Sequence, residues 1–372
     1  MRAIILVSMA LVFSSCRMTP IGSQDFKPSQ NTNSRIQYDK LKNFNSTYAL
    51  VLIPNENKMQ VLDMMVNRID SSFKTGNKPS DISVSPDKRR ILVTNSLDGT
   101  VSSYFRESGA KISYLGVIGS GDNPTSVIFN NSGTEAFVAY NDSSRINVLK
   151  ILEREKPSVK KVLRVKDDNQ DFKPYNLAIS DDDNTLFAID RTSANLAIFK
   201  KENGDFVQKE IFNLDTLLKA KLENIIYNQD KLYISDSYNN QIIVFDLKAN
   251  NVSNRISLKK EASNIDLIST KMVINKNTNK IYVVNEGAAS ISVVDILTNQ
   301  VSKEINLSSN SRNDNNLPTA LSISNDGTII YVTGASGKNL SIISTKTDSL
   351  LRNTGTTDSF GDLPVFSAIR ML

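Results

Sequence analysis

The chain has 372 residues, of which 40% are hydrophobic and 22% charged, and its formal net charge is +5. This is the balance of a folded protein with enough apolar material for a core. The sequence contains no histidine and a single cysteine. Within this chain, a Ser-His-Asp or Cys-His nucleophile, a histidine-ligated metal site and an internal disulfide are therefore excluded.

The first residues have the pattern of a bacterial export signal. Residues 3–13 are apolar, a length too short to span a membrane but suited to a signal peptide. The run Phe13-Ser14-Ser15-Cys16 resembles a lipobox, in which the cysteine is acylated and becomes the first residue of the mature protein. We predict a lipoprotein signal peptide over residues 1–15 and lipidation of Cys16. A plain signal peptide is the alternative.

Residues 16–46 are polar and rich in Ser, Asn and Gln, which predicts a lipidated cysteine followed by a flexible tether. Several acyl chains on Cys16 would anchor the protein stably in a membrane. Arg17 follows Cys16, in place of the Asp that retains some lipoproteins at the inner membrane. We therefore expect an outer-membrane lipoprotein whose body, residues 47–372, lies at the cell surface or faces the periplasm.

The body contains a window that occurs seven times, with successive starts 42–50 residues apart. Each window has an apolar tetrad, a loop rich in Asn, Ser, Gly and Asp, and a second apolar segment, the pattern of strand, turn and strand. The tetrads are apolar almost throughout, as in strands that are buried on both faces. The windows are 49–63, 91–105, 136–150, 186–200, 232–246, 281–295 and 330–344.

A further apolar segment precedes most windows, and a more polar one follows, which gives four strands per repeat. Ile82-Ser83-Val84 is an example of the first kind, and Val301 to Ile305 of the second. The first window has no preceding strand. Ser367-Ala368-Ile369 follows Pro364 at the offset seen in other repeats, so it is the candidate to complete the first blade. The sequence predicts an all-β, seven-bladed β-propeller of four-stranded antiparallel blades, closed by this C-terminal strand.

Three tetrads carry a family resemblance. Tyr282-Val283-Val284-Asn285, Tyr331-Val332-Thr333-Gly334 and Leu92-Val93-Thr94-Asn95 resemble the YVTN repeat of surface-layer-like seven-bladed propellers. The resemblance covers roughly residues 47–372 and implies the fold more strongly than a function. Lipid-anchored proteins of this kind occur in spirochaetes and Bacteroidota, and the resemblance implies binding of host matrix for some of them.

Candidate metal ligands lie where each tetrad meets its loop. Asn95, Asp190, Asp236 and Asn285 occupy this position in four repeats, and their oxygens are of the type that Ca²⁺ prefers. The alternative is that these side chains bond to the backbone of their own turns. We assign no catalytic residue and no ligand-binding residue, and we expect no cofactor other than this calcium.

Two other segments stand out. Asp181-Asp182-Asp183 lies in a predicted hairpin turn, and we interpret it as a solvated turn rather than a metal loop. The leucines of residues 213–222 have helical spacing and predict a short helix between the fourth and fifth blades.

We expect a monomeric binding or scaffold propeller rather than an enzyme, anchored to the membrane through Cys16. Its expected partners are proteins, extracellular matrix or glycans. No nucleic acid is expected, because the densest basic run, Lys150 to Lys166, also contains two glutamates and has no aromatic side chains between its basic residues. The alternatives are a propeller enzyme of the lactonase or lyase type and a periplasmic assembly scaffold.

Overall fold

The computed structural model describes residues 48–372 except 65–67, 120, 167–171, 216–218, 260–266, 308–316, 335–338 and 356–368. The predicted signal peptide (1–15), Cys16 and the rest of the predicted tether (16–46) lie outside the described residues. Within the described part, no helix has the length and hydrophobicity needed to cross a membrane.

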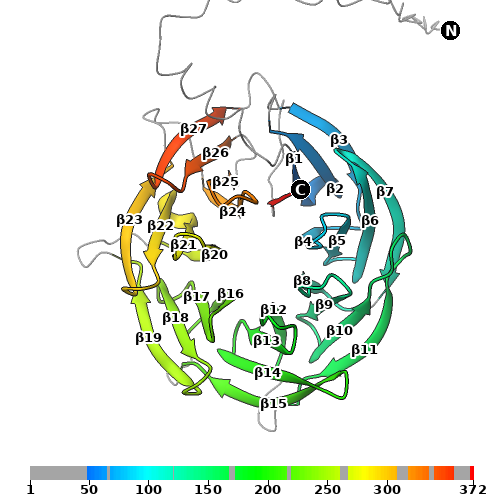
Figure 1. The fold of residues 1–372 in the computed structure, drawn as a ribbon, viewed down its shortest axis with the longest axis horizontal. Helices are drawn as coiled ribbons and strands as arrows, with labels where there is room; N and C mark the ends of the chain where they lie inside the picture. Colours follow the sequence, from blue (N-terminus) through cyan, green and yellow to red (C-terminus); the bar gives the residue numbers. More distant parts are fainter. Residues whose placement is uncertain are drawn as a thin grey trace, which may run out of the picture. The chain divides into compact units, whose positions relative to one another are not determined.

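Seven four-stranded antiparallel sheets surround a central channel, so the predicted seven-bladed propeller is confirmed (Figure 1). The strands of each blade are given from the channel outward. Blade 1 consists of β28 (Ile369–Met371), β1 (Tyr48–Ile53), β2 (Lys58–Asp63) and β3 (Arg68–Lys74), and blade 2 of β4 (Pro79–Val84), β5 (Arg90–Asn95), β6 (Thr100–Ser108) and β7 (Lys111–Gly119). Blade 3 consists of β8 (Pro124–Phe129), β9 (Glu135–Tyr140), β10 (Arg145–Lys150) and β11 (Ser158–Arg164), and blade 4 of β12 (Pro174–Ile179), β13 (Thr185–Asp190), β14 (Asn195–Glu202) and β15 (Asp205–Asn213). Blade 5 consists of β16 (Leu222–Asn228), β17 (Lys231–Asp236), β18 (Gln241–Asp246) and β19 (Asn251–Ser257). Blade 6 consists of β20 (Ser269–Asn275), β21 (Lys280–Asn285), β22 (Ser290–Asp295) and β23 (Gln300–Asn306). Blade 7 consists of β24 (Pro318–Ile323), β25 (Ile329–Gly334), β26 (Asn339–Ser344) and β27 (Ser349–Gly355). Two short 3₁₀ turns, η1 (Pro54–Glu56) and η2 (Glu286–Ala288), connect strands in blades 1 and 6.

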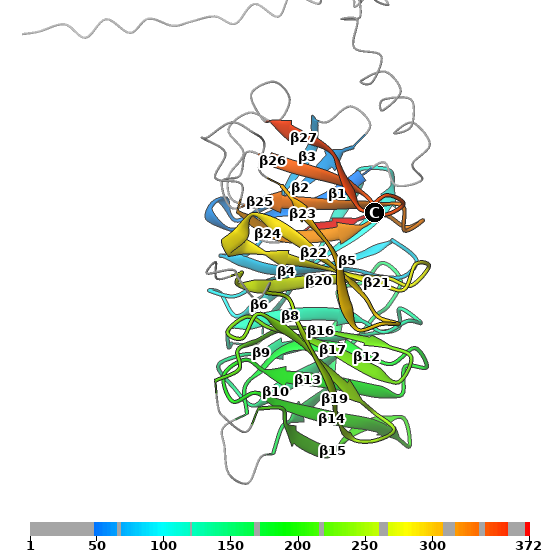
Figure 2. The same ribbon diagram turned by 90° about the vertical axis from the view of Figure 1, so that its left-hand side faces the viewer.

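The core is divided among the interfaces between neighbouring blades, which stack around the ring (Figure 2). The second and third strands of each blade are apolar because both of their faces pack against a neighbouring blade. Phe137 of blade 3 meets Phe206 of blade 4 edge to face, with ring centroids 5.2 Å apart. Phe212 of blade 4 meets Phe245 of blade 5 at 4.9 Å. Each blade is therefore held by two neighbours rather than by a core of its own.

Side-chain hydrogen bonds also join the innermost strands across blades. The Asp81 carboxylate of β4 accepts a hydrogen bond from the Val127 backbone N–H of β8, at 3.0 Å. Asn224 Oδ1 of β16 accepts one from the Met272 N–H of β20, at 3.2 Å. Because these groups are buried or half-buried, an unpaired N–H at either place would cost free energy. These bonds fix the spacing of the strands that line the channel.

The C-terminal strand closes the ring, in agreement with the prediction. Of the predicted strand Ser367-Ala368-Ile369, Ser367 and Ala368 lie outside the described residues, and Ile369 begins β28. Ile369 pairs with Val51 and Met371 with Ala49, and the Leu372 N–H donates to Tyr48 O at 3.0 Å. This pairing buries Met371 and Leu372.

The helix predicted over residues 213–222 is not found in the described part of that segment. Asn213 ends β15, Leu222 begins β16, and residues 216–218 lie outside the described ranges. The Asp215 carboxylate accepts hydrogen bonds from the backbone N–H groups of Lys219 and Ala220. Leu214 and Leu222 both pack into the core between blades 4 and 5, but they do so from outside any helix: Leu214 directly follows β15, and Leu222 begins β16.

Candidate functional site

The two predicted acidic metal ligands hold turns in their own blades. Asp190 Oδ1 accepts hydrogen bonds from the backbone N–H groups of Thr192 and Ser193, and Oδ2 from that of Lys173. Asp236 Oδ1 accepts from the Lys221 N–H, and its Oδ2 accepts from two side-chain amides. Both carboxylates are almost fully buried. They are thus occupied by local donors, as the turn-bond alternative describes.

The two predicted amide ligands are also buried and engaged. Asn95 donates from Nδ2 to the hydroxyls of Thr100 and Ser102, and its Oδ1 accepts from the Gly76 N–H. Asn285 bonds to three serine hydroxyls in blade 6. Among the described residues, no group of three or more Asp, Glu or Cys side chains is placed to hold a metal ion. Calcium binding at these four positions stays a prediction.

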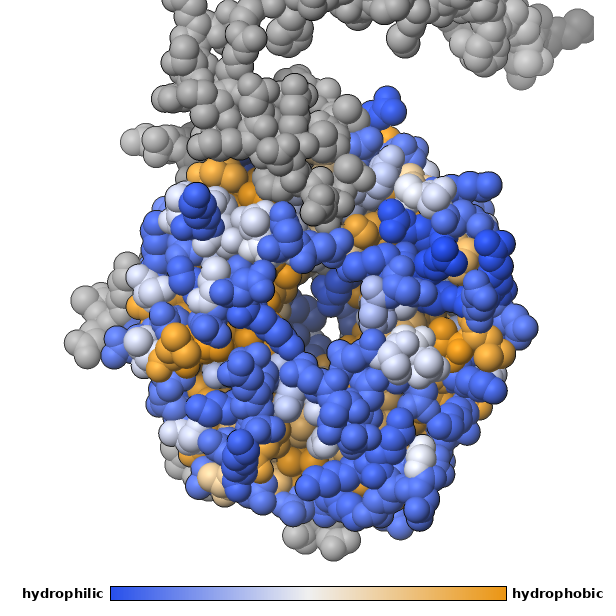
Figure 3. All heavy atoms as spheres, viewed as in Figure 1, coloured by the Kyte–Doolittle hydropathy of each residue, from blue (hydrophilic) through white to orange (hydrophobic). Residues whose placement is uncertain are grey.

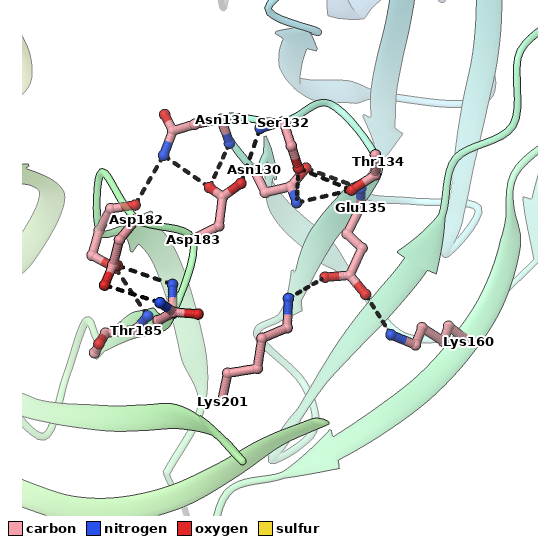
Figure 4. A network of polar contacts seen from close by, with 12 residues as sticks. Asn130, Asn131, Ser132, Thr134, Glu135, Lys160, Asp182, Asp183, Thr185 and Lys201 are labelled. Atoms are coloured by element: carbon pink, nitrogen blue, oxygen red, sulfur yellow. Dashed lines mark hydrogen bonds and ion pairs between the residues drawn. The ribbon is translucent and has the colours of Figure 1, made fainter. Parts of the chain in front are cut away.

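Asp183, the last residue of the Asp181-Asp182-Asp183 run, connects blade 4 to blade 3 (Figure 4). Asp183 accepts hydrogen bonds from the backbone N–H groups of Asn131 and Ser132 in blade 3, at 2.6 and 2.9 Å. Asp182 accepts from Ser180 and Asn184 within its own turn, and these bonds lower the pKa of its carboxyl. The run therefore has a structural role, consistent with its interpretation as a turn.

The central channel contains a cavity of about 190 Å³. An opening at the middle of the ring is visible in the space-filling view (Figure 3). Its lining comes from the innermost strands of all seven blades. The polar and charged lining residues are Asp81, Ser126, Asn176, Asn224, Lys271 and Arg370.

Charged side chains gather at one end of this channel, in blades 4 to 6. Tyr175, Glu223 and Thr270 each directly precede a lining residue, at the start of an innermost strand. Arg191 and Glu286 directly follow the second strand of their blades. Because neighbouring strands are antiparallel, the start of one and the end of the next lie at the same edge. We call Tyr175, Arg191, Lys221, Glu223, Thr270, Lys271 and Glu286 the mouth cluster.

Glu223 is the buried centre of the mouth cluster. Its Oε1 accepts hydrogen bonds from Arg191 Nη2 at 2.7 Å and Nε at 3.1 Å, and from Ser237 Oγ at 3.1 Å. Lys221 Nζ lies 3.6 Å from the same oxygen. The Glu223 side chain is only 5% exposed, so the pairing with Arg191 offsets the cost of burying its charge.

Glu286 is the second carboxylate and is more exposed than Glu223. Burial raises the pKa of Glu286, and the negative charge of Glu223 raises it further. The hydrogen bond from Thr270 Oγ1, at 3.0 Å, and the charges of Lys271 and Lys221 act in the opposite direction. A carboxyl whose pKa is shifted toward neutrality is suited to exchange protons with a substrate or water.

Tyr175 completes the arrangement. The guanidinium of Arg191 lies over its ring, 4.8 Å from the centroid. Burial, followed by the charge of Glu223, raises the pKa of Tyr175 to about 12. The phenol therefore stays protonated near neutral pH and can donate a hydrogen bond.

Sequence reasoning missed the mouth cluster, although a signal for it existed. The residue before the channel-lining position is a hydroxyl-bearing residue in other repeats, such as Ser80, Thr125 and Thr270, whereas blade 5 has Glu223. The position after the proposed metal ligands holds Arg191 and Glu286. The metal hypothesis concerned only the residue before this position, whose side chain forms hydrogen bonds within its own turn.

Comparison with known proteins supports the fold and gives one partial family match. The family model described as "Lactonase, 7-bladed beta-propeller" matches residues 49–170, which form most of blades 1 to 3. The mouth cluster lies beyond this segment, in blades 4 to 6. A search of curated proteins found no match.

Solved structures match the chain over most of its length. A periplasmic gluconolactonase from Pseudomonas aeruginosa has a TM-score of 0.67 and 14% identity, covering 87% of this chain and 98% of that one. A putative 6-phosphogluconolactonase from Bacteroides fragilis also gives 0.67 and 14%, covering 88% and 98%. A protein from Lactobacillus plantarum gives 0.71 and 11%, covering 88% and 99%. At these identities the likeness shows the fold alone.

The prediction that this chain is not an enzyme is wrong in the light of the family match. The absence of histidine excludes nucleophile pairs that depend on histidine, but water activated by a carboxylate needs none. The YVTN family, the lipid anchor and the bacterial group stay predictions. The chain is therefore a seven-bladed propeller that is similar, over residues 49–170, to the model of a family of seven-bladed lactonases.

Proposed function

We propose that the protein hydrolyses a lactone ring at the mouth cluster. The observation that supports this most directly is the pairing of two carboxylates, Glu223 and Glu286, with the cations of Arg191, Lys221 and Lys271 beside the channel cavity. The match with the lactonase model supports the same class of reaction. It favours an enzyme over the matrix-binding function expected from the sequence.

Glu286 is assigned as the general base. Its carboxylate takes a proton from water while the water oxygen attacks the lactone carbonyl carbon. The tetrahedral intermediate then collapses, the ring C–O bond breaks, and the leaving alkoxide receives the proton from Glu286. The product is an open-chain hydroxy acid. A raised pKa makes the protonated form of Glu286 easier to reach in the middle of this sequence.

The cations supply the electrostatic part of catalysis. Negative charge develops on the carbonyl oxygen as water adds, and a positive group fixed beforehand at that place lowers the barrier. Arg191 is fixed by its two hydrogen bonds to Glu223, and Lys271 lies in the cavity wall. Glu223 is thus a positioning residue for Arg191, and the protonated phenol of Tyr175 interacts with the same carboxylate.

The cavity limits the substrate to a small and polar lactone. Its volume of about 190 Å³ and its lining of amide, hydroxyl and charged groups suit a ring that carries several hydroxyls. The neighbours named gluconolactonase and 6-phosphogluconolactonase are consistent with a sugar-acid lactone.

The test is acid release from glucono-1,5-lactone, followed by titration at constant pH and corrected for spontaneous hydrolysis. We expect catalysed release by the wild-type chain and a loss of about 10²-fold or more in Glu286→Gln. Glu56→Gln, which changes an exposed carboxylate in η1, is the matched control and should keep the full rate. Equal rates in wild type and Glu286→Gln would exclude Glu286 as the base. No catalysed release from a panel of sugar-acid lactones would contradict the lactonase proposal.

We also propose that the propeller is exported and anchored by lipid on Cys16. The support is the sequence of residues 1–16 alone. The measurement is protease digestion of intact and lysed cells, followed by a blot for the propeller. Loss of signal in intact cells would place the body outside, and protection until lysis would place it in the periplasm.

A further inference from the structure

A second cavity lies between blades 3 and 4, away from the central channel. Its volume is about 490 Å³, and it shares no lining residue with the channel cavity. The turns 130–134 and 180–184 follow the ends of β8 and β12, at the edge of the blades opposite to the mouth cluster. The lining residues are Asn130, Ser132, Thr134, Glu135, Lys150, Lys160, Asp183 and Lys201.

Glu135, the first residue of β9, joins two lysines from neighbouring blades (Figure 4). Its Oε1 accepts a hydrogen bond from Lys160 Nζ of β11 at 2.6 Å, and its Oε2 accepts one from Lys201 Nζ of β14 at 3.1 Å. Lys201 Nζ also lies 5.1 Å from the centroid of the Phe206 ring. The Glu135 side chain is only 10% exposed, so the two lysines offset the cost of burying its charge. Both ammonium groups are thus held within the span of one carboxylate and its hydrogen bonds.

The strands of blade 3 bring a third lysine to the same place. β11 shifts its register on β10 between Val148 and Leu149, and Lys160 is the extra residue of the resulting β-bulge. A bulge changes the direction of a side chain. Lys150 pairs directly with Glu135 across β9 and β10, so these two side chains lie on the same face of the sheet.

The hydrogen-bond acceptors of the cavity are already in use. Each carboxylate oxygen of Glu135 accepts from a lysine, as described above. The Asp183 carboxylate accepts from the backbone N–H groups of Asn131 and Ser132 and from the Asn131 side-chain amide. Asn130 Oδ1 accepts from the Glu135 N–H at 2.9 Å. A ligand in this cavity therefore meets acceptors that already have donors.

Donors, in contrast, remain in excess. An ammonium group has three N–H donors. Lys160 and Lys201 each use one of them on the shared carboxylate, and Lys150 forms no ion pair within the described residues. Ser132 Oγ and Thr134 Oγ1 lie 2.9 Å apart and share one hydroxyl proton, which leaves the other hydroxyl proton for a ligand. The cavity is therefore suited to a ligand that only accepts hydrogen bonds.

We propose that this cavity binds a phosphate or sulfate group, free or as the ester of a small molecule, through Lys150, Lys160 and Lys201. The lining contains three lysines and two carboxylates, so its net charge is +1 and favours an anion. A tetrahedral oxyanion has acceptor oxygens in several directions, and lysines bind such a group as separate point charges. The volume lies in the range of about 300–1,000 Å³ that is typical of small-molecule sites. This site does not depend on the proposed lactonase activity.

The test is isothermal titration calorimetry of the full chain with inorganic phosphate and inorganic sulfate, each compared with chloride at equal ionic strength. We expect at least one of the two oxyanions, but not chloride, to bind. Glycerol phosphate is the third ligand, with uncharged glycerol as its reference. A lower Kd for glycerol phosphate than for inorganic phosphate would assign the site to esters, and equal or higher values would assign it to the free ion.

Lys150→Met is the decisive variant, because Lys150 is exposed and its loss breaks no ion pair of the described residues. It should keep the wild-type Tm in chloride, while its Kd for the bound oxyanion rises at least about ten-fold. Lys160→Met should weaken binding in the same direction. Lys161→Met is the matched control, since Lys161 pairs with Asp205 at 2.9 Å and does not line the cavity. Equal heats for the oxyanions and chloride, or an unchanged Kd in Lys150→Met, would overturn the proposal.

Discussion

The carboxylate of Asp81 accepts the backbone N–H of Val127 through Oδ2 and that of Ile82 through Oδ1, while Arg370 lies 3.7 Å from Oδ1. This one side chain contacts blades 1, 2 and 3. Asp81 is only 7% exposed, so water cannot fully replace its carboxylate as a partner of these N–H groups and of Arg370. Asp81 therefore stabilises the ring at the point where it closes.

Replacement of Asp81 by Ala should lower the free energy of unfolding by about 2–4 kcal/mol, because the N–H groups of Ile82 and Val127 lose this acceptor and Arg370 loses the negative charge beside it. Urea denaturation followed by tyrosine fluorescence measures this. Asp70→Ala, in the outer strand β3, is the control and should change stability by less than about 0.5 kcal/mol. Equal stabilities of the two variants would contradict a stabilising role for Asp81.

The lactonase rate should depend on pH through Glu286. A base must be deprotonated, so kcat/KM rises with pH through the Glu286 pKa, and burial places this midpoint above the ordinary glutamate value of 4.5. Lys221→Met removes a charge that lowers this pKa, so the midpoint should move to higher pH. Lys231→Met, remote from the mouth cluster at the start of β17, should leave it unchanged. A midpoint that does not move in Lys221→Met would argue against Glu286 as the titrating group.

Arg191 should be needed for the rate rather than for folding. Arg191→Lys keeps a positive charge beside Glu223 but loses the paired N–H geometry and the stacking on Tyr175. We expect kcat to fall by about 10²-fold with a modest change in KM. Arg352→Lys in β27 is the matched control. If KM alone changed, Arg191 would be a substrate-binding group rather than one that stabilises the transition state.

Deletion of residues 369–372 should destabilise the whole ring. The deletion exposes the edge of β1 and removes the buried side chains of Met371 and Leu372, which together contribute about 3–6 kcal/mol. Hydrogen exchange should then increase in blade 1 and in the neighbouring blade 2. If hydrogen exchange increased only in β1 (Tyr48–Ile53), β28 would protect the edge of β1 without stabilising the whole ring.

The fold could be predicted because each blade repeats the same local pattern. The tetrad and loop of a window such as 281–295 specify two strands and a turn without reference to distant residues. Closure of the first blade by the C-terminal strand could also be predicted, because the first window lacks a preceding strand. The helix predicted over residues 213–222 is wrong at its described ends, because Asn213 belongs to β15 and Leu222 to β16.

The candidate site could not be predicted in the same way. Arg191, Glu223 and Glu286 are separated by tens of residues, and only the closed ring brings them to one end of the channel. Asn95, Asp190, Asp236 and Asn285 are predicted metal ligands because their side-chain oxygens are of the type that Ca²⁺ prefers. In the structure, their oxygens and amides are used by nearby donors and acceptors. Residue type alone does not distinguish a turn-forming aspartate from a ligand.

The pairing of β28 with β1 also has a consequence for biosynthesis. Translation makes β1 first among the strands of the body, and its partner follows only after β27. Until then blade 1 is a three-stranded sheet with an unpaired inner edge, a form prone to association with other strands. The wall of the channel also lacks Arg370 during this time. The nascent protein must therefore be kept from aggregating until β28 is made, and the channel cavity is not complete before that moment.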